Sequence, residues 1–178
     1  MSMRILIAED EMDTAIQYKI ALEERNHEVI LAMDGEVCLR LYKEGLRRHA
    51  YYKQNEENKP TSHECVDSMF DVVVLDYRMP KENGMNVAKE ILRLNPHQRL
   101  IFASAYVKET LFDSIRQLRH VVELIQKPFE LDMLINIIED ETSYKKLQEL
   151  NEYLKELNEF DLTQEQVKDL LESIERLR

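Results

Sequence analysis

The stretch that most constrains this chain is Val72–Leu75, four consecutive apolar residues that are followed by the carboxylate of Asp76. An apolar run without alternation suits a strand that is covered on both faces, as in parallel sheets. Ligands of such sheets gather outside the carboxyl ends of the strands. The segment therefore places Asp76 where chemistry would occur, although an ordinary polar residue opening a loop would look the same in isolation.

Short apolar runs alternate with helical spacing along the chain. The runs are Ile5–Ala8, Val29–Ala32, Val72–Leu75, Leu100–Ala103 and Val121–Ile125. Between them, apolar residues recur every three or four positions, for example at Val87, Ile91 and Leu94 and at Leu111, Ile115 and Leu118. The pattern predicts five strands and five helices in alternation, which is an α/β fold with a doubly wound, five-stranded parallel sheet and helices on both faces.

The composition excludes several classes of protein. With 24 basic and 35 acidic residues the formal net charge is -11, which disfavours nucleic-acid binding because phosphate recognition draws on clusters of Lys and Arg. No apolar run approaches the roughly 20 residues that cross a bilayer, and no signal peptide is evident. Cys38 and Cys65 are too few for a disulfide framework. We expect a cytoplasmic protein with no membrane or nucleic-acid partner.

The residues that follow the predicted strands form a chemically coherent set. They are Glu9 and Asp10, Asp76, Ser104 and Lys127. Because the ends of parallel strands converge, we expect these groups to share one shallow pocket. Converging carboxylates need a cation, and oxygen ligands of this kind suit Mg²⁺. A lysine and a hydroxyl beside that ion are what a transferred phosphoryl group needs, since its catalysis is mostly positioning and charge neutralisation.

Four motifs in the same order resemble the receiver domain of two-component response regulators. They are Ile5–Glu11, Val74–Pro80 with Gly84, Phe102–Ala105 and Gln126–Phe129. The resemblance to these chemotaxis-regulator-like domains covers roughly residues 3–140. It implies the strand order 2-1-3-4-5. We therefore expect a receiver domain at 1–140 and a helical C-terminal extension at 141–178.

The resemblance also implies an acceptor and a metal site. Asp76 would accept a phosphoryl group from a phosphohistidine on a histidine kinase or phosphotransfer protein. Asp10, Asp76 and the backbone carbonyl of Arg78 would bind Mg²⁺ directly, and Glu9 would act through water. Glu11 is expected to be solvated.

Further roles follow from the same resemblance. Lys127, whose bond to Pro128 is cis in the family, would pair with the phosphoryl oxygens. Ser104 would move toward the phosphoryl group, and the small Ala105 would leave it a path. Arg78 and Tyr106 would flank the pocket and tune the phosphoryl lifetime. Phosphorylation would then shift a two-state equilibrium on the face of the fourth helix, fifth strand and fifth helix.

The chain departs from the family pattern in two places. Leu124 stands where the family often has an aromatic residue that couples to the switch hydroxyl. We therefore expect the conformational response to phosphorylation to be altered more than phosphoryl transfer itself. An insertion at about 46–69 is predicted to extend the second helix and then form a mobile loop. His49, His63 and Cys65 raise a metal-site hypothesis, but their spacing matches no established ligand pattern, which favours scattered polar side chains.

Residues 139–178 hold 12 acidic and 6 basic residues, which disfavours a nucleic-acid output. A seam of four leucines is predicted to continue the fifth helix: Leu147, Leu150, Leu154 and Leu157. A capping box at Thr163–Gln166 then opens a last helix that carries Val167, Leu170, Leu171, Ile174 and Leu177. These helices would pack on each other or on the receiver, pair in a homodimer, or dock on an effector.

The sequence thus predicts a response regulator that signals by phosphorylation-dependent contact with a downstream protein. It would be a phosphoacceptor switch that assists its own phosphorylation and dephosphorylation, not an enzyme. The alternative is a phosphorylation-independent scaffold or dimerisation module with the receiver fold, which Leu124 and the insertion leave open. A hydrolase with an aspartyl-phosphate intermediate is set aside because Arg78 stands where that class usually has a second acid.

Overall fold

The computed structural model describes residues 2–54, 69–105, 115, 118 and 120–158, with the backbone alone for 53–54 and 154–158. The chain divides into two compact units, Met1–Glu139 and Asp140–Arg178. They are described separately below.

The first unit is built on a five-stranded sheet in which every neighbouring pair is parallel. The strands are β1 (Arg4–Ala8), β2 (Glu28–Ala32), β3 (Val72–Leu75), β4 (Arg99–Ser104) and β5 (Val122–Gln126). Their order is β2-β1-β3-β4-β5, so the predicted fold class and strand order are confirmed. Every residue of β3 and β4 is buried, which accounts for the absence of polar alternation in both segments.

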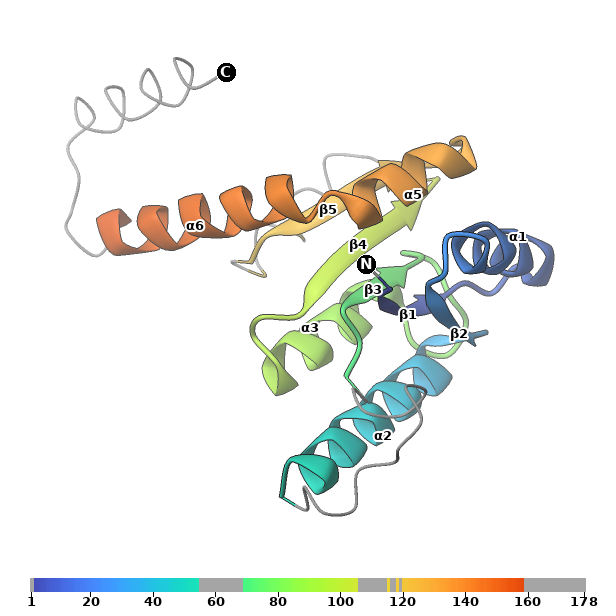
Figure 1. The fold of residues 1–178 in the computed structure, drawn as a ribbon, viewed down its shortest axis with the longest axis horizontal. Coiled ribbons are helices and arrows are strands. Elements are labelled where there is room, and N and C mark those ends of the chain that lie inside the picture. The colour runs from blue at the N-terminus through green and yellow to red at the C-terminus, as the bar shows by residue number, and fades with distance from the viewer. Residues whose placement is uncertain (1, 55–68, 106–114, 116–117, 119, 159–178) are drawn as a thin grey trace. The chain divides into compact units, whose positions relative to one another are not determined.

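Helices cover both faces of the sheet (Figure 1). They are α1 (Met12–Glu23), α2 (Gly35–Gln54), α3 (Gly84–Leu94) and α5 (Leu131–Glu139). The helix predicted at 111–118 falls mostly outside the described residues, as does Tyr106. Helix α2 includes His49 and runs into the predicted insertion, whereas His63 and Cys65 lie outside the described part.

Two apolar layers hold the helices to the sheet. Helices α2 and α3 pack on the side chains of Leu6, Val73, Leu75 and Phe102. Helices α1 and α5 pack on the opposite face, which has its own set of buried residues: Ile5, Ile7, Val72, Val74, Ile101 and Ile125. Successive residues of β3 point alternately into these two layers. All four are therefore buried and apolar: Val72, Val73, Val74 and Leu75.

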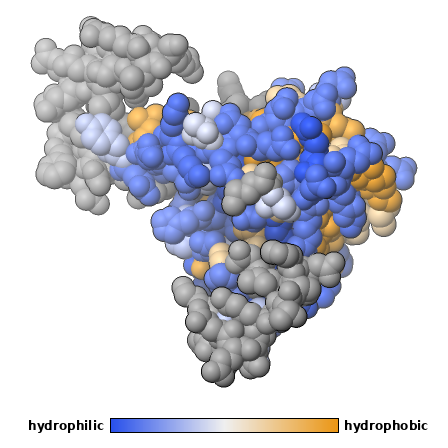
Figure 2. Space-filling model, in the orientation of Figure 1, coloured by the Kyte–Doolittle hydropathy of each residue, from blue (hydrophilic) through white to orange (hydrophobic). Residues whose placement is uncertain are grey.

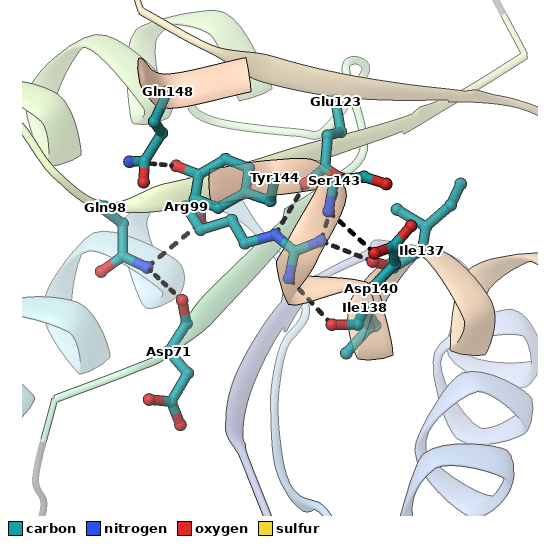
Figure 3. A network of polar contacts seen from close by, with 10 residues as sticks. All are labelled: Asp71, Gln98, Arg99, Glu123, Ile137, Ile138, Asp140, Ser143, Tyr144 and Gln148. Carbon is teal, nitrogen blue, oxygen red and sulfur yellow. Dashed lines mark hydrogen bonds and ion pairs between the residues drawn. The ribbon is translucent and has the colours of Figure 1, made fainter. Parts of the chain in front are cut away.

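A buried arginine on β4 holds the end of α5 (Figure 3). The Arg99 guanidinium forms two hydrogen bonds to Glu123, of 2.8 and 3.0 Å. It also donates to the carbonyls of Ile138 at 2.9 Å and Ile137 at 2.5 Å. These carbonyls belong to the last turn of α5, where no following helical N–H can donate to them.

The second unit begins with α6 (Glu141–Asn158). The prediction that the leucine seam continues the fifth helix is wrong, because α5 ends at Glu139 and Asp140 is not helical. The Asp140 carboxylate instead accepts from the Ser143 N–H at 2.9 Å and so starts a new helix. The side chains of Leu154 and Leu157 and the predicted helix after Thr163 lie outside the described residues.

Among the described residues, no helix is both long enough and apolar enough to span a membrane.

Candidate functional site

Backbone hydrogen bonds bring the ends of neighbouring strands together. The N–H of Asp76 donates to the carbonyl of Ala8 at 2.8 Å, which ties the residue after β3 to the end of β1. The N–H of Lys127 donates to the carbonyl of Ser104 at 2.9 Å, which ties the residue after β5 to the end of β4. The positions of Asp76 and Lys127 are therefore set by the sheet.

One pocket at this edge has a volume of about 500 Å³. It is lined by Glu9, Asp10, Glu11, Asp76, Arg78, Ser104, Ala105 and Lys127. The structure thus brings together the residues to which the resemblance gave roles in phosphoryl transfer and Mg²⁺ binding. Glu11 also lines it, as an exposed residue whose carboxylate accepts from the Thr14 hydroxyl at 2.8 Å.

Lys127 lies between two carboxylates of this pocket. Its ammonium is 2.8 Å from Oδ2 of Asp76 and 2.5 Å from Oε2 of Glu9. Burial alone would lower the pKa of Lys127, but the hydrogen bonds to Asp76 and Glu9 outweigh it and hold the pKa above its ordinary value. Lys127 is therefore a permanent positive charge in the pocket.

Glu9 is the most buried of the acids, with 3% of its side chain exposed. Burial raises the pKa of Glu9, and the hydrogen bond from Lys127 opposes the rise without cancelling it. The family resemblance implied a water-mediated role for Glu9 toward a metal. The structure shows that this carboxylate also contacts Lys127 directly.

The acidic residues fit a divalent cation. Glu9, Asp10 and Asp76 each offer a carboxylate oxygen, and these oxygens lie within 4.8 Å of one another. One ammonium balances only part of the charge of three carboxylates, and the remaining negative charge faces a polar pocket. A hard cation with oxygen ligands, such as Mg²⁺, matches both the charge and the donor atoms.

The loop between β3 and α3 closes tightly behind Asp76. The N–H of Arg78 donates to Oδ1 of Asp76 at 3.0 Å. A Cβ atom added to Gly84 would lie 2.1 Å from the carbonyl oxygen of Asp76, so only glycine permits this approach. The Asn83 carboxamide caps α3 by accepting from the Asn86 N–H at 2.9 Å.

Ser104 and Ala105 complete the pocket on the β4 side. Ser104 is the last residue of β4 and is 1% exposed, whereas Ala105 is exposed. The peptide bond between Lys127 and Pro128 is cis, as the resemblance implied. Leu124 is partly buried against the core beside α2 and α3.

A second pocket of about 520 Å³ adjoins the first and was not anticipated from the sequence. Thr14, Tyr18 and Phe129 line it, and Lys127 lines both pockets. The Tyr18 ring stacks on the Phe129 ring with a centroid distance of 5.5 Å. The contact joins two residues more than a hundred positions apart, so no local sequence pattern indicates it.

Comparisons with known proteins agree with this geometry. Residues 53–139 match the family model of the response regulator receiver domain. The transcriptional regulatory protein DltR of Streptococcus agalactiae is 28% identical over 151 residues, which are 84% of this chain and 56% of that protein. The chain thus spans little more than half the length of DltR.

Two solved structures illustrate the similarity in fold. A response regulator receiver domain protein from Clostridium thermocellum is 26% identical, with a TM-score of 0.57 over 82% of this chain and 98% of that one. A CheY-like receiver domain protein from Methanospirillum hungatei JF-1 is 18% identical, with a TM-score of 0.58 over 86% and 98% of the two chains. The sheet order and these neighbours show the receiver fold, and the family match over residues 53–139 identifies a response regulator receiver domain in the chain.

Proposed function

We propose that this chain accepts a phosphoryl group on Asp76 and signals through the resulting change in protein contacts. The observation that carries the proposal is the position of the Lys127 ammonium, 2.8 Å from Oδ2 of Asp76, in a pocket that also holds Glu9, Asp10 and Ser104. A scaffold that never meets a phosphoryl group has no need of this arrangement.

The transfer step exchanges one bond to phosphorus for another. A carboxylate oxygen of Asp76 attacks the phosphorus of a phosphohistidine, the phosphorus–nitrogen bond breaks, and the imidazole leaves after taking a proton. Lys127 neutralises the charge that gathers on the phosphoryl oxygens. The chain is in this sense a switch that assists its own phosphorylation and dephosphorylation.

We propose that Mg²⁺ would be held by four groups: the carboxylates of Glu9, Asp10 and Asp76 and the backbone carbonyl of Arg78. A bound divalent cation supplies charge neutralisation for the transferring phosphoryl group. Asp10 is exposed and so reachable from solvent, whereas buried Glu9 would act through a water molecule.

Ser104 is proposed to report the modification. Its backbone carbonyl accepts a hydrogen bond from the N–H of Lys127, so a movement of either residue would displace the other. Because Leu124 replaces the aromatic partner frequent in the family, we propose that Ser104 and Lys127 carry the change to β5 without a swinging ring.

The phosphodonor is proposed to dock beside α1. Three apolar residues on this helix are unusually exposed, Met12 at 53%, Ile16 at 41% and Ile20 at 52%. Figure 2 shows apolar surface at the edge of the molecule where α1 lies in Figure 1. The second pocket lies between this helix and Phe129. An exposed apolar face beside the acceptor suits docking of a histidine kinase or phosphotransfer protein. Because such a donor acts in the cytoplasm, we propose a cytoplasmic location for the chain.

The output is proposed to be a protein contact, with a homodimer through α6 as one form of it. Leu147 and Tyr153 are 45% and 49% exposed on this helix. The leucines at 147, 150, 154 and 157 keep the 3-4-3 spacing of a coiled-coil seam. Uncharged Asn151 and Tyr153 stand beside the seam, as expected for an interface that excludes charge.

Phosphorylation of Asp76 is tested with a small phosphodonor. Incubation with Mg²⁺ and acetyl phosphate should add one phosphoryl group, detected by intact-protein mass spectrometry, and Asp76→Asn should abolish it. Asp13→Asn, the same change on an α1 residue that does not line the pocket, is the control and should be modified like the wild type. A label that persists in Asp76→Asn would rule out the assignment.

The scaffold alternative predicts a different response. Beryllofluoride mimics the phosphoryl group on an aspartate, so a phosphorylation-dependent switch should change its elution volume or its oligomeric mass when Mg²⁺ and beryllofluoride are added. A scaffold should bind no beryllofluoride and should keep the same mass. Size-exclusion chromatography with light scattering separates the two.

A further inference from the structure

An ion pair holds the loop after Asp76 at the end away from the pocket. The Lys81 ammonium lies 2.6 Å from Oδ2 of Asp34, in the turn between β2 and α2. Asp34 is buried, with 10% of its side chain exposed, whereas the Lys81 side chain is 53% exposed. Neither residue lines the phosphoryl pocket.

Asp34 is itself fixed from the opposite side. Its Oδ1 accepts from the N–H of Val37 at 2.8 Å, and its carbonyl accepts from the N–H of Cys38 at 3.0 Å. Asp34 therefore caps the start of α2 while it binds Lys81. The hydrogen bond from Lys81, followed by that from Val37, holds the pKa of Asp34 below its ordinary value, so the carboxylate stays charged.

The loop backbone also presses on the first residue of α2. A Cβ atom added to Gly35 would lie 2.2 Å from the carbonyl oxygen of Glu82. A side chain at position 35 would therefore clash with a backbone atom, which cannot move aside as the end of a flexible side chain could. The loop is thus clamped at Lys81 and Glu82 against the start of α2.

The other end of the loop is clamped against the acceptor. The Arg78 N–H donates to Asp76, and the Gly84 N–H donates to the carbonyl of Tyr77 at 3.1 Å. Lys81 follows Arg78 by three residues, within one short and tightly folded segment. A shift at Lys81 therefore changes where the N–H and carbonyl of Arg78 stand.

The backbone of Lys81 is unusual. Its φ is 65°, in the left-handed region that lysine seldom adopts. A surface ion pair of a half-exposed lysine contributes little to stability, so stability is a weak reason for holding a lysine in this conformation. Fixing the loop is a stronger one.

We propose that Lys81 and Asp34 are positioning residues for the phosphoryl site. Their ion pair fixes the loop so that the Arg78 N–H meets Asp76 and the Arg78 carbonyl faces the acidic cluster. The inference rests on the proposed function for its chemistry, because the Arg78 carbonyl matters as a ligand only where Mg²⁺ binds.

The test compares four variants. Lys81→Met removes the ammonium and keeps the apolar stem. Lys81→Asn also removes the ammonium but suits the left-handed backbone, so it is not expected to lose stability through strain. Lys81→Arg keeps the charge, and Lys89→Met makes the same change at an exposed lysine of α3 that forms no ion pair with a described residue.

Two readouts are measured. In the metal-free protein, amide hydrogen exchange of Arg78 and Gly84 should be several-fold faster in Lys81→Met and Lys81→Asn. The Mg²⁺ affinity, measured by calorimetry, should fall about tenfold in both, as for other residues that support a metal ligand. Lys81→Arg should restore both readouts, Lys89→Met should change neither, and the melting temperature of Lys81→Asn should stay close to that of the wild type.

Unchanged exchange and unchanged Mg²⁺ affinity in Lys81→Met would overturn the proposal, and so would an equal loss in Lys89→Met. The exchange measurement needs neither metal nor phosphoryl group. If the wild-type chain bound no Mg²⁺, the proposed function would fail, whereas faster exchange at Arg78 in the Lys81 variants would still support the positioning role.

Discussion

The ammonium of Lys127 lies 2.8 Å from the carboxylate of Asp76, although 51 positions separate the two residues in the chain. Lys127 also contacts Glu9, so one cation serves two acids that follow two neighbouring strands. The charge balance of the pocket therefore depends on this lysine whenever no metal or phosphoryl group is bound.

Replacing Lys127 should expose that dependence. Lys127→Met leaves the buried carboxylate of Glu9 without its cation, and we expect a loss of about 2 kcal/mol in the metal-free protein, less than for a fully buried pair because the lysine is partly exposed. Mg²⁺ should stabilise this variant more than the wild type, since it restores a positive charge. Thermal melts with and without Mg²⁺ measure both effects.

Phosphorylation of the same variant by acetyl phosphate should slow at least about tenfold, because charge neutralisation at the phosphoryl oxygens is lost. Lys89→Met is the matched control and should behave as the wild type. Equal melting temperatures and equal rates in Lys127→Met and the wild type would contradict the role given to Lys127.

The raised pKa of Glu9 predicts a pH-dependent stability. Because its pKa in the folded protein lies above the ordinary value of 4.5, the folded state holds this proton more tightly than the unfolded state does. The resulting stability is fully present below pH 4.5 and is lost as the pH rises through the raised pKa. At neutral pH, Glu9→Gln should therefore raise the melting temperature of the metal-free protein.

The gain from Glu9→Gln should shrink as the pH falls through the raised pKa of Glu9 toward 4.5, because wild-type Glu9 in the folded protein then becomes protonated as well. Melting curves across this range provide the measurement. Glu24→Gln, the same change at an exposed residue, serves as the control. A difference between Glu9→Gln and the wild type that did not vary with pH would count against burial as the cause.

Arg99 should prove essential for the end of α5. Removing its guanidinium leaves Glu123 and the carbonyls of Ile137 and Ile138 without their donors, and we expect Arg99→Met to cost about 3 kcal/mol in urea unfolding. Arg99→Lys should recover little, because an ammonium cannot form the paired hydrogen bonds to Glu123. Full stability in Arg99→Lys would show that charge alone suffices.

The homodimer proposal predicts a change in mass. Leu147→Glu places a charge in the leucine seam of α6 and should shift the chain toward the monomer in size-exclusion chromatography with light scattering. Thr142→Glu, at an exposed position of the same helix, should leave the mass unchanged. A wild-type chain that is monomeric at all concentrations, with beryllofluoride and without it, would exclude the dimer.

Local patterns were sufficient to predict the sheet and the composition of the pocket. Val72–Leu75 is apolar throughout because successive residues face two buried layers, and this requirement is visible in four consecutive letters. The residues after each strand are equally local, so Glu9, Asp10, Asp76, Ser104 and Lys127 could be grouped before their geometry was known. The parallel arrangement then brought them to one edge.

What only the tertiary structure decided are contacts between residues far apart in the chain. Arg99 binds the carbonyls of Ile137 and Ile138 in the last turn of α5, which ends at Glu139, whereas the leucine spacing alone predicted a continuous helix. Lys81 binds Asp34 across 47 positions, and no periodicity in either segment indicates it. Periodicity reports which face of an element is buried, whereas the partner of a charged side chain depends on how distant elements pack, and that is decided when the chain folds.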